Sequence, residues 1–178
     1  MSRTIEIDLL DASSVDAAIR EIQEYANWVQ TKTDELRERV AELIRRNAHI
    51  LFVRGGDELL ESDSMFTWND VEVRVESGGD NTTLVIADGK EAVFIEFGAG
   101  VYYNGPVGSS PNPLGAGLGF TIGSYGKGYG AKEVWGFYGE DGELHLTHGT
   151  PANMPLYNAV QSVSQDIVRI ARGVFSDT

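Results

Sequence analysis

TWNDVEVRVESGGDNTTLVIAD, Thr67 to Asp88, carries the clearest secondary-structure signal in the chain. Valines alternate with charged residues through VEVRVE, residues 71–76, which is the pattern of a strand with one buried face. GGDN supplies residues that favour a tight turn, and TTLVIAD has the composition of a returning strand. We therefore predict an antiparallel β-hairpin here.

A helical pattern precedes the hairpin. Ser13 or Ser14 is a candidate N-cap. Apolar residues then recur at helical spacing, at Val15, Ile19, Ile22, Ala26, Val29, Leu36, Val40, Leu43 and Ile44. Neither Gly nor Pro interrupts Ser13 to Val53, so we expect one long helix or two abutting helices, followed by a polar loop over residues 53–66. The poor helix formers around Thr33 are where a break would fall, and an unbroken helix would be a strut that also contacts neighbouring subunits.

Three further segments have clear patterns. TIEIDLL, residues 4–10, alternates apolar and acidic residues and predicts a half-buried strand. EVWGFYGEDGELHLTH, residues 133–148, predicts a second hairpin with EDG at its turn. A C-terminal amphipathic helix is expected from Pro155, which is tolerated in a first turn. Its apolar face would contain Leu156, Val160, Val163, Ile167, Ile170 and Val174.

Glycine is concentrated in one part of the chain. Residues 98–142 contain 14 of the 21 glycines and three of the five prolines. Gly105 to Gly130 cannot be regular helix, and we expect a long mobile loop at about residues 98–131. GSYGKGYGA, residues 123–131, lacks the first glycine and the hydroxyl residue of a phosphate-binding loop, and KEVWGFY after it predicts a strand. We therefore expect no nucleotide or other cofactor.

Composition limits the function classes. The 178 residues are 42% hydrophobic and 23% charged, as in a globular protein, and most simply form a single domain over residues 1–178. The sequence has no apolar run long enough for a transmembrane helix, and the acids near its start argue against a signal peptide. The absence of cysteine excludes disulfides and thiolate metal sites. The net charge of −13 disfavours a protein that grips nucleic acid through its phosphates, but not one that lies beside DNA.

The candidate metal ligands are Glu143, His145 and His148, with His49 as a remote third histidine. His145 and His148 follow a strand-like alternation, so their side chains would point to opposite faces. We therefore predict no metal site.

Hydrolytic chemistry has one candidate residue. The chain lacks a G-x-S-x-G nucleophile motif, but Glu96 lies in the apolar stretch VFIEFGAG, where its pKa could rise. A carboxylate-based hydrolase would use Glu96 with Glu143 or Asp141. A single glutamate in such a stretch is more often a structural hydrogen-bond acceptor, here one that fixes the glycine turn after it.

VFIEFGAGVYYNG, residues 93–105, resembles the signature of the siphophage tail-completion, or head–tail joining, family of minor tail components. The matching residues are Glu96, Phe97, Gly98 and Gly100, while Ala99 stands where the family usually has threonine. GKGYG, VWGFY and THGTPANMPLYNAV follow in the family's order. The resemblance covers nearly the whole chain.

The resemblance implies an α+β fold, in which a long N-terminal helix and a C-terminal amphipathic helix pack on an antiparallel β-sheet. It also implies a non-enzymatic, tail-terminator-like virion protein of a phage or prophage, which forms a ring, commonly a hexamer, at the head-proximal end of the tail. Its partners would be other copies of itself, the tail-tube protein and the head-completion or connector proteins. DNA would pass through without specific binding, and no membrane would be involved. The protein would assemble in the bacterial cytoplasm and then belong to the virion.

Two sets of site residues follow. Glu96, Phe97, Gly98 and Gly100 would set where the glycine-rich loop leaves the folded body. Aromatic residues of the loop would contact a neighbouring subunit or partner, namely Tyr102, Tyr103, Phe120, Tyr125 and Tyr129. The alternatives are a hydrolase that uses Glu96 and a module that presents the loop to a small ligand.

Overall fold

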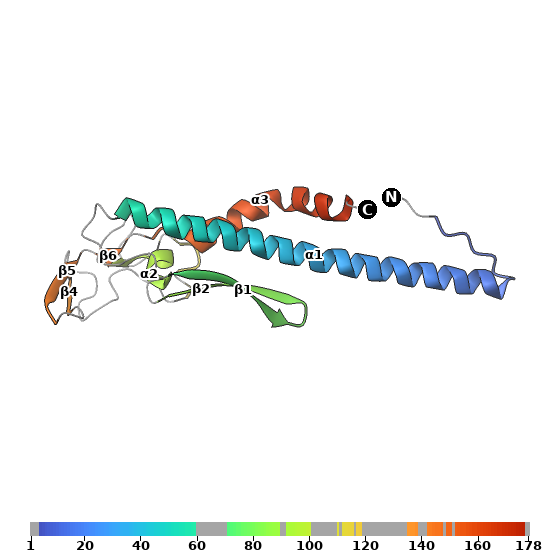
Figure 1. The fold of residues 1–178 in the computed structure, drawn as a ribbon, viewed down its shortest axis with the longest axis horizontal. Helices are drawn as coiled ribbons and strands as arrows, with labels where there is room; N and C mark the ends of the chain where they lie inside the picture. The colour runs from blue at the N-terminus through green and yellow to red at the C-terminus, as the bar shows by residue number, and fades with distance from the viewer. Residues whose placement is uncertain are drawn as a thin grey trace. The chain divides into compact units, whose positions relative to one another are not determined.

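The computed structural model describes residues 4–59, 71–89, 92–100, 110, 112–115, 117–118, 135–138, 142–147, 149–150 and 152–176. Its elements are α1 (Ala12–Leu59), β1 (Glu72–Gly79), β2 (Thr82–Asp88), α2 (Ala92–Phe97), β3 (Ala99–Gly100), β4 (Trp135–Tyr138), β5 (Leu144–Thr147), β6 (Gly149–Thr150) and α3 (Pro155–Ser176) (Figure 1). The expected α+β class is confirmed. None of the described helices is long and apolar enough to cross a membrane.

The chain divides into two compact units. The first consists of Met1–Val40 with Ile167–Thr178, and the second is Ala41–Asp166. Helices α1 and α3 contribute residues to both units.

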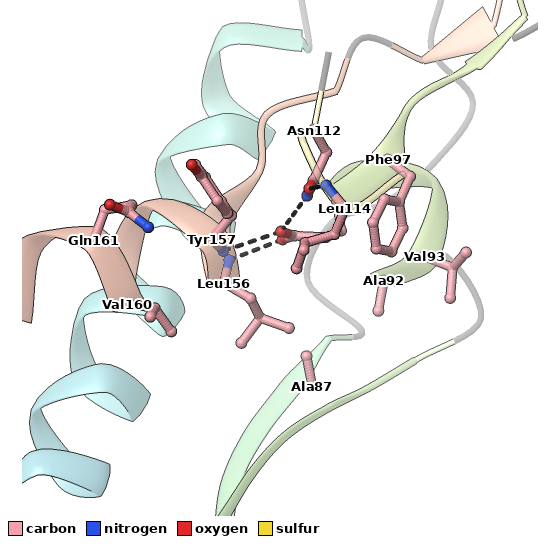
Figure 2. A pocket seen from close by; sticks show the side chains of 11 residues that line it. Ala87, Ala92, Val93, Phe97, Asn112, Leu114, Leu156, Tyr157, Val160 and Gln161 are labelled. Carbon is pink, nitrogen blue, oxygen red and sulfur yellow. Dashed lines mark hydrogen bonds between the residues drawn. The ribbon is translucent and has the colours of Figure 1, made fainter. Parts of the chain in front are cut away.

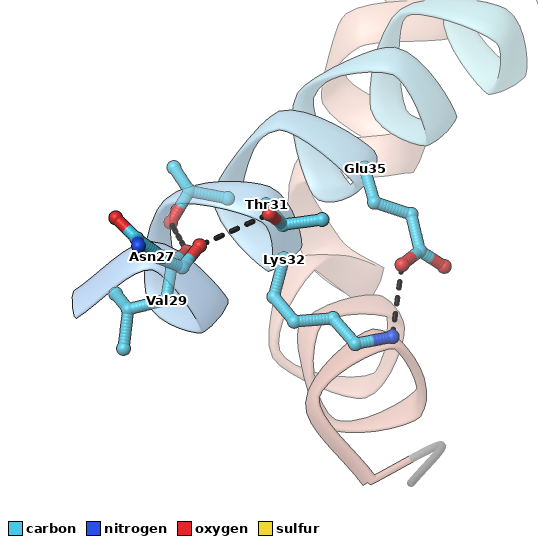
Figure 3. Close-up of polar contacts among 6 residues, drawn as sticks. Asn27, Val29, Thr31, Lys32 and Glu35 are labelled. Carbon is cyan, nitrogen blue, oxygen red and sulfur yellow. Dashed lines mark hydrogen bonds and ion pairs between the residues drawn. The ribbon is translucent and has the colours of Figure 1, made fainter. Parts of the chain in front are cut away.

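Helix α1 is continuous through the segment around Thr33, where the sequence left open either one long helix or a break. The hydroxyl of Thr31 donates to the carbonyl of Asn27 at 3.0 Å, and that of Thr33 to the carbonyl of Val29 at 2.8 Å (Figure 3). These bonds satisfy the threonine hydroxyls without displacing the backbone from its helical ladder. Lys32 adds an ion pair one turn along the helix, with Nζ 2.9 Å from the Glu35 carboxylate. Of the two alternatives, one long helix is confirmed, and the break near Thr33 does not occur.

Both ends of α1 differ from the prediction. The N-cap is Asp11, not Ser13 or Ser14, because the Asp11 carboxylate accepts the Ser13 N–H at 2.9 Å and its carbonyl accepts the Ser14 N–H at 3.1 Å. At the other end the helix continues past Val53 to Leu59, so the polar loop does not begin at Val53. The pair Gly55–Gly56 is tolerated inside the helix at a cost in propensity.

TIEIDLL does not form the predicted strand. Thr4–Asp8 has no regular secondary structure, and Leu9 and Leu10 lie in a turn with side chains 83% and 98% exposed. The described residues include no strand paired with this segment. A strand needs a neighbour for its backbone hydrogen bonds, and the alternating pattern alone supplies none.

The first unit is held by aromatic and aliphatic contacts between its parts of α1 and α3. Trp28 of α1 stacks on Tyr25 at a centroid distance of 5.6 Å and meets Phe175 of α3 edge-on at 5.8 Å. Val174, next to Phe175, is fully buried, and so is nearly all of Ile170 one turn earlier. These rings and branched side chains fix the end of α3 in this unit.

The predicted hairpin is confirmed as β1 and β2. The strands are antiparallel with Val73 opposite Ala87 and Val75 opposite Val85. Asp80 and Asn81 form the two-residue turn with φ values of 42° and 61°, as a type I′ turn requires. Asn and Asp tolerate this left-handed conformation better than most residues, which explains the turn's position.

The core of the second unit lies where the hairpin, α1 and α2 meet α3. Its buried residues are Ala48, Phe52, Val71, Val73, Ala92, Ile95 and Ala159. Phe52 and Ile95 are its largest fully buried side chains. Phe52 of α1 and Ile95 of α2 thus anchor the two helices to each other through buried apolar contacts.

The remaining strands form two small antiparallel pairs. The predicted second hairpin is confirmed by β4 and β5, in which Phe137 lies opposite His145. The stretch GKEAVFIEFGAG, which fits a helix or a strand, forms α2 and then β3. Strand β3 pairs with β6. That contact joins two-residue strands far apart in sequence, which are too short to show a period of two.

Helix α3 begins at Pro155 as predicted, but its buried face is shifted. Val163, Ile170 and Val174 are buried, whereas Val160 and Ile167 are about 40% exposed. Ala159 is fully buried in their place. The small side chain of Ala159 lets α3 approach the core closely. A small residue is therefore buried here, while the larger Val160 and Ile167 stay partly exposed.

Candidate functional site

The carboxylate of Glu96 lies at the junction of α2, α3 and the glycine-rich segment. It is 5% exposed and accepts three hydrogen bonds. The backbone N–H of Leu156 donates to Oε2 at 2.8 Å, the N–H of Tyr157 to Oε1 at 3.0 Å, and the side-chain amide of Asn112 to Oε1 at 2.9 Å (Figure 2).

Two of these bonds make Glu96 the N-terminal cap of α3. The first helical residue is Pro155, which has no N–H, so Leu156 and Tyr157 carry the next unpaired amides of the first turn. The preceding residue, Met154, has a φ of 51° and a thioether that accepts hydrogen bonds only weakly. A carboxylate from another helix therefore takes the place of a local cap, and its charge is favourable at this end of the helix dipole.

The third bond fixes part of the glycine-rich segment. Asn112 is 1% exposed, and its side-chain oxygen accepts the N–H of Leu114 at 3.0 Å. Ser110 donates from Oγ to the carbonyl of Phe97 at 2.6 Å. A side chain at Gly115 would place its Cβ 2.5 Å from that of Ser110, so this tight turn needs glycine. Ser110 and Asn112 thus fasten this turn to α2.

Two backbone features complete the junction. The N–H of Asn153 donates to the carbonyl of Ile95 at 2.9 Å, which joins the chain before α3 directly to α2. Gly98 ends α2 with a φ of 78° and donates its N–H to the carbonyl of Phe94 at 2.8 Å. This left-handed C-terminal position favours glycine. Gly100 lies in the extended strand β3.

The electrostatics of Glu96 combine opposing effects. Burial raises the pKa of its carboxyl group, and the two backbone N–H donors and the Asn112 amide oppose that rise by stabilising the charged form. The N–H groups of Leu156 and Tyr157 and the side-chain amide of Asn112 are all donors, so they stabilise the ionised form. The carboxylate thus joins α2, α3 and the segment around Asn112.

A hollow of about 430 Å³ lies beside this junction. Its lining is mostly apolar and consists of Ala87, Ala92, Val93, Glu96, Phe97, Asn112, Leu114, Leu156, Tyr157, Val160 and Gln161 (Figure 2). Glu96 is the only acid in that lining. The hydrolase alternative needs a second carboxylate; Glu143 is an exposed residue before β5, and Asp141 lies outside the described residues.

Most of the other predicted site residues lie away from this junction or outside the described part of the chain. The five aromatic interface residues, Tyr102, Tyr103, Phe120, Tyr125 and Tyr129, lie outside the described part of the chain, as do most of the expected mobile loop and His148. His145 lies in β5, and His49 is exposed on α1. Asn112 and Ser110 were missed. The sequence SSPNP around them indicates a turn, but nothing in it identifies Glu96 as the partner.

Comparison of the chain with protein-family models, with curated proteins and with solved structures found no match.

Proposed function

We propose that this chain is a structural virion protein of a tailed phage or prophage, which forms a ring at the head-proximal end of the tail and joins the tail to the head. The resemblance of two sequence stretches suggests this function. The observation that supports it best is that these stretches meet in space. Glu96 of VFIEFGAGVYYNG accepts the N–H groups of Leu156 and Tyr157 of THGTPANMPLYNAV.

The bonding of Glu96 favours a structural role for the motif. A general acid or base must be within reach of a substrate proton, whereas this carboxylate is buried and directed at three protein donors. The same bonds connect the start of α3 to the glycine-rich segment. Such a junction suits a protein whose task is to hold a loop in position for contact with other subunits.

Assembly into a ring requires two different, complementary patches on each copy. The described surface includes large exposed apolar side chains on α1, at Ile19, Ile22 and Tyr25, each about half exposed. They are candidates for one patch. The net charge of −13 suits a ring through which DNA passes, because repulsion would limit adhesion.

The proposal is tested in a phage that encodes this chain. Disruption of its gene should give separate filled heads and tails, which electron microscopy would show, and supply of the protein in trans should restore joined particles. The purified protein should show a mass that increases from micromolar to higher concentration toward a closed oligomer. Normal joined particles in the absence of the protein would refute the assignment.

A small-ligand module is the second candidate, and the hollow beside Glu96 favours it. Its volume of about 430 Å³ lies in the range of small-molecule sites, and its lining is mostly apolar. A hydrophobic dye such as anilinonaphthalene sulfonate should then bind, and Val160→Trp, at the wall of the hollow, should abolish the binding. Equal dye binding by the variant would exclude this hollow as the site.

A further inference from the structure

The first turns of helix α1 carry an apolar stripe at heptad spacing. The stripe consists of Val15, Ile19, Ile22, Ala26 and Val29, which are separated by four, three, four and three residues. Ile19 and Ile22 are about half exposed, and Ala26 is exposed. This spacing suits a second helix packed along the stripe, since a heptad repeat keeps one seam facing a partner helix.

The contact of α1 with α3 inside the first unit uses a different face. Trp28, which meets Phe175 edge-on, is two positions from Ala26 and six from Ile22. Residues share a helix face at separations of three, four and seven, so Trp28 lies on another face than the stripe. The stripe is therefore a second apolar face of α1.

The last turns of α3 expose an apolar patch, which consists of Ile167, Val168 and Ala171. Val168 is 59% exposed and Ile167 is 38% exposed, while Ala171 is half-buried. The three residues share one face, because Ala171 follows Ile167 by four positions and Val168 by three. Ile170 and Val174 are buried, so the patch extends the apolar face of α3 beyond the part that is packed.

The charges around the two surfaces are opposite. Residues 4–27 contain six acidic residues and one basic residue, whereas residues 167–176 contain Arg169 and Arg172 and no acid. Arg172 follows Val168 by four positions and so borders the patch. Two stripes packed on each other would bring the acids together, whereas the end of α3 brings arginines to them. The patch on α3 is therefore the better partner for the stripe.

We infer that the α1 stripe of one copy packs against the α3 patch of a second copy. The inference rests on the proposed ring and names one of its contacts. Both surfaces belong to the first compact unit, and they are unlike, so each copy offers one surface and receives the other. Contacts of this kind close a ring when the rotation between neighbours allows it.

Two variants each disrupt one surface. Ile22→Glu places a carboxylate in the stripe, and Val168→Glu places one in the patch. Both residues are more than half exposed, and glutamate is a good helix former, so each variant should keep its fold. Each variant alone should associate about tenfold or more weakly than the wild type, because a charge must be buried without a partner.

An equimolar mixture of the two variants gives the sharpest measurement. Each variant keeps the surface that the other lacks, so the stripe of Val168→Glu can still bind the patch of Ile22→Glu. The mixture should form dimers and no larger species, which sedimentation equilibrium would show. Dimers formed by Val168→Glu alone would indicate that two stripes pair, and they would overturn the inference.

The matched control is Ile50→Glu, the same substitution on α1 at a residue that is 40% exposed and belongs to the second unit. It should leave association unchanged. Circular dichroism of every variant at low concentration should match the wild type. Association of the wild type should weaken as salt concentration rises, and Arg172→Glu should reduce this dependence, because screening acts on the opposite charges of the two surfaces.

The outcomes separate the contact from the ring. Assembly that persists unchanged in Ile22→Glu and Val168→Glu overturns the helix contact and leaves the proposed ring standing. A monomer of Ile22→Glu that is much less stable to urea than Ile50→Glu indicates that the stripe is packed within one copy, and this also overturns the contact. A wild type that stays monomeric at every concentration overturns both.

Discussion

The N-termini of α1 and α3 are capped in opposite ways. Asp11 caps α1 from the adjacent position, with its carboxylate in solvent and bonded to Ser13. Glu96 caps α3 from a helix 60 residues earlier, and its carboxylate is buried. The first cap organises one turn of one helix. The second also joins α2, α3 and the glycine-rich segment, so its loss should affect the whole second unit.

The comparison shows why a buried cap couples distant segments. At an exposed helix end, water can replace a lost side chain as the partner of the first amides. At a buried end, an amide left without an acceptor costs its desolvation free energy. The cap of α3 is therefore expected to be far more costly to remove than that of α1.

The largest effect is expected for Glu96→Gln. Glutamine keeps the size of the side chain but offers a single carbonyl oxygen and an NH₂ group that faces other donors. The free energy of unfolding of the second unit should fall by about 3 kcal/mol, and the amides of Leu156 and Tyr157 should exchange faster. Urea denaturation and hydrogen exchange measure both quantities. The control is Glu38→Gln on the exposed side of α1, and an equal, small change in both variants would contradict the capping role of Glu96.

Asn112→Ala should have a smaller effect of about 1–2 kcal/mol, because it removes one bond to Glu96 and the bond to the Leu114 amide but leaves the cap of α3 intact. Faster exchange should appear at Leu114 and Gly115 and not at Tyr157. Gln23→Ala, an exposed amide on α1, is the control. Faster exchange at Tyr157 in Asn112→Ala would mean that the cap depends on the loop.

Local patterns predicted most of the elements. Alternation in VEVRVE and the GGDN turn predicted the β1–β2 hairpin, and the helical spacing before it predicted α1. In these segments the residues that pair in space are close in sequence, so the local pattern is enough to predict their pairing. The same method failed for TIEIDLL, where the side chains alternate but the described residues include no partner strand.

The junction at Glu96 could be predicted only in part. An acid within an apolar stretch suggested a structural acceptor, and Gly98 in the same motif suggested a special backbone angle. The identities of the donors could not be read in advance, because Asn112 and Leu156 lie 16 and 60 residues away and their meeting depends on the packing of α2 against α3. Met154 before Pro155 was a usable sign, since it marks a helix without a local cap.

The pH dependence of stability should distinguish the two carboxylates. Burial, the dominant cause, raises the pKa of folded Glu96 above its ordinary value of 4.5. As pH falls through that raised pKa, the folded state takes up the proton before the unfolded state does, so the contribution of Glu96 to the free energy of unfolding rises until about pH 4.5. The difference between wild type and Glu96→Gln should therefore grow in this window on acidification. A difference that shrinks there would show that the hydrogen bonds outweigh burial.

Asp11 should give the smallest effect and the opposite sign. Hydrogen bonds from the Ser13 side chain and backbone lower its pKa below the ordinary value of 3.8. Stability from this cap is thus complete above about pH 3.8 and is lost as pH falls through the lower, folded value. Asp11→Asn keeps an acceptor oxygen but cannot titrate. The protection of the Ser13 and Ser14 amides, measured relative to their intrinsic exchange rates, should therefore not change with pH in the variant. In the wild type this protection should fall on acidification. Since the site is exposed, the fraying should remain within the first turn of α1. If Asp11→Asn instead altered exchange at Trp28 or beyond, the start of α1 would be coupled to the rest of the first unit, and the contrast between a local and a connecting cap would fail.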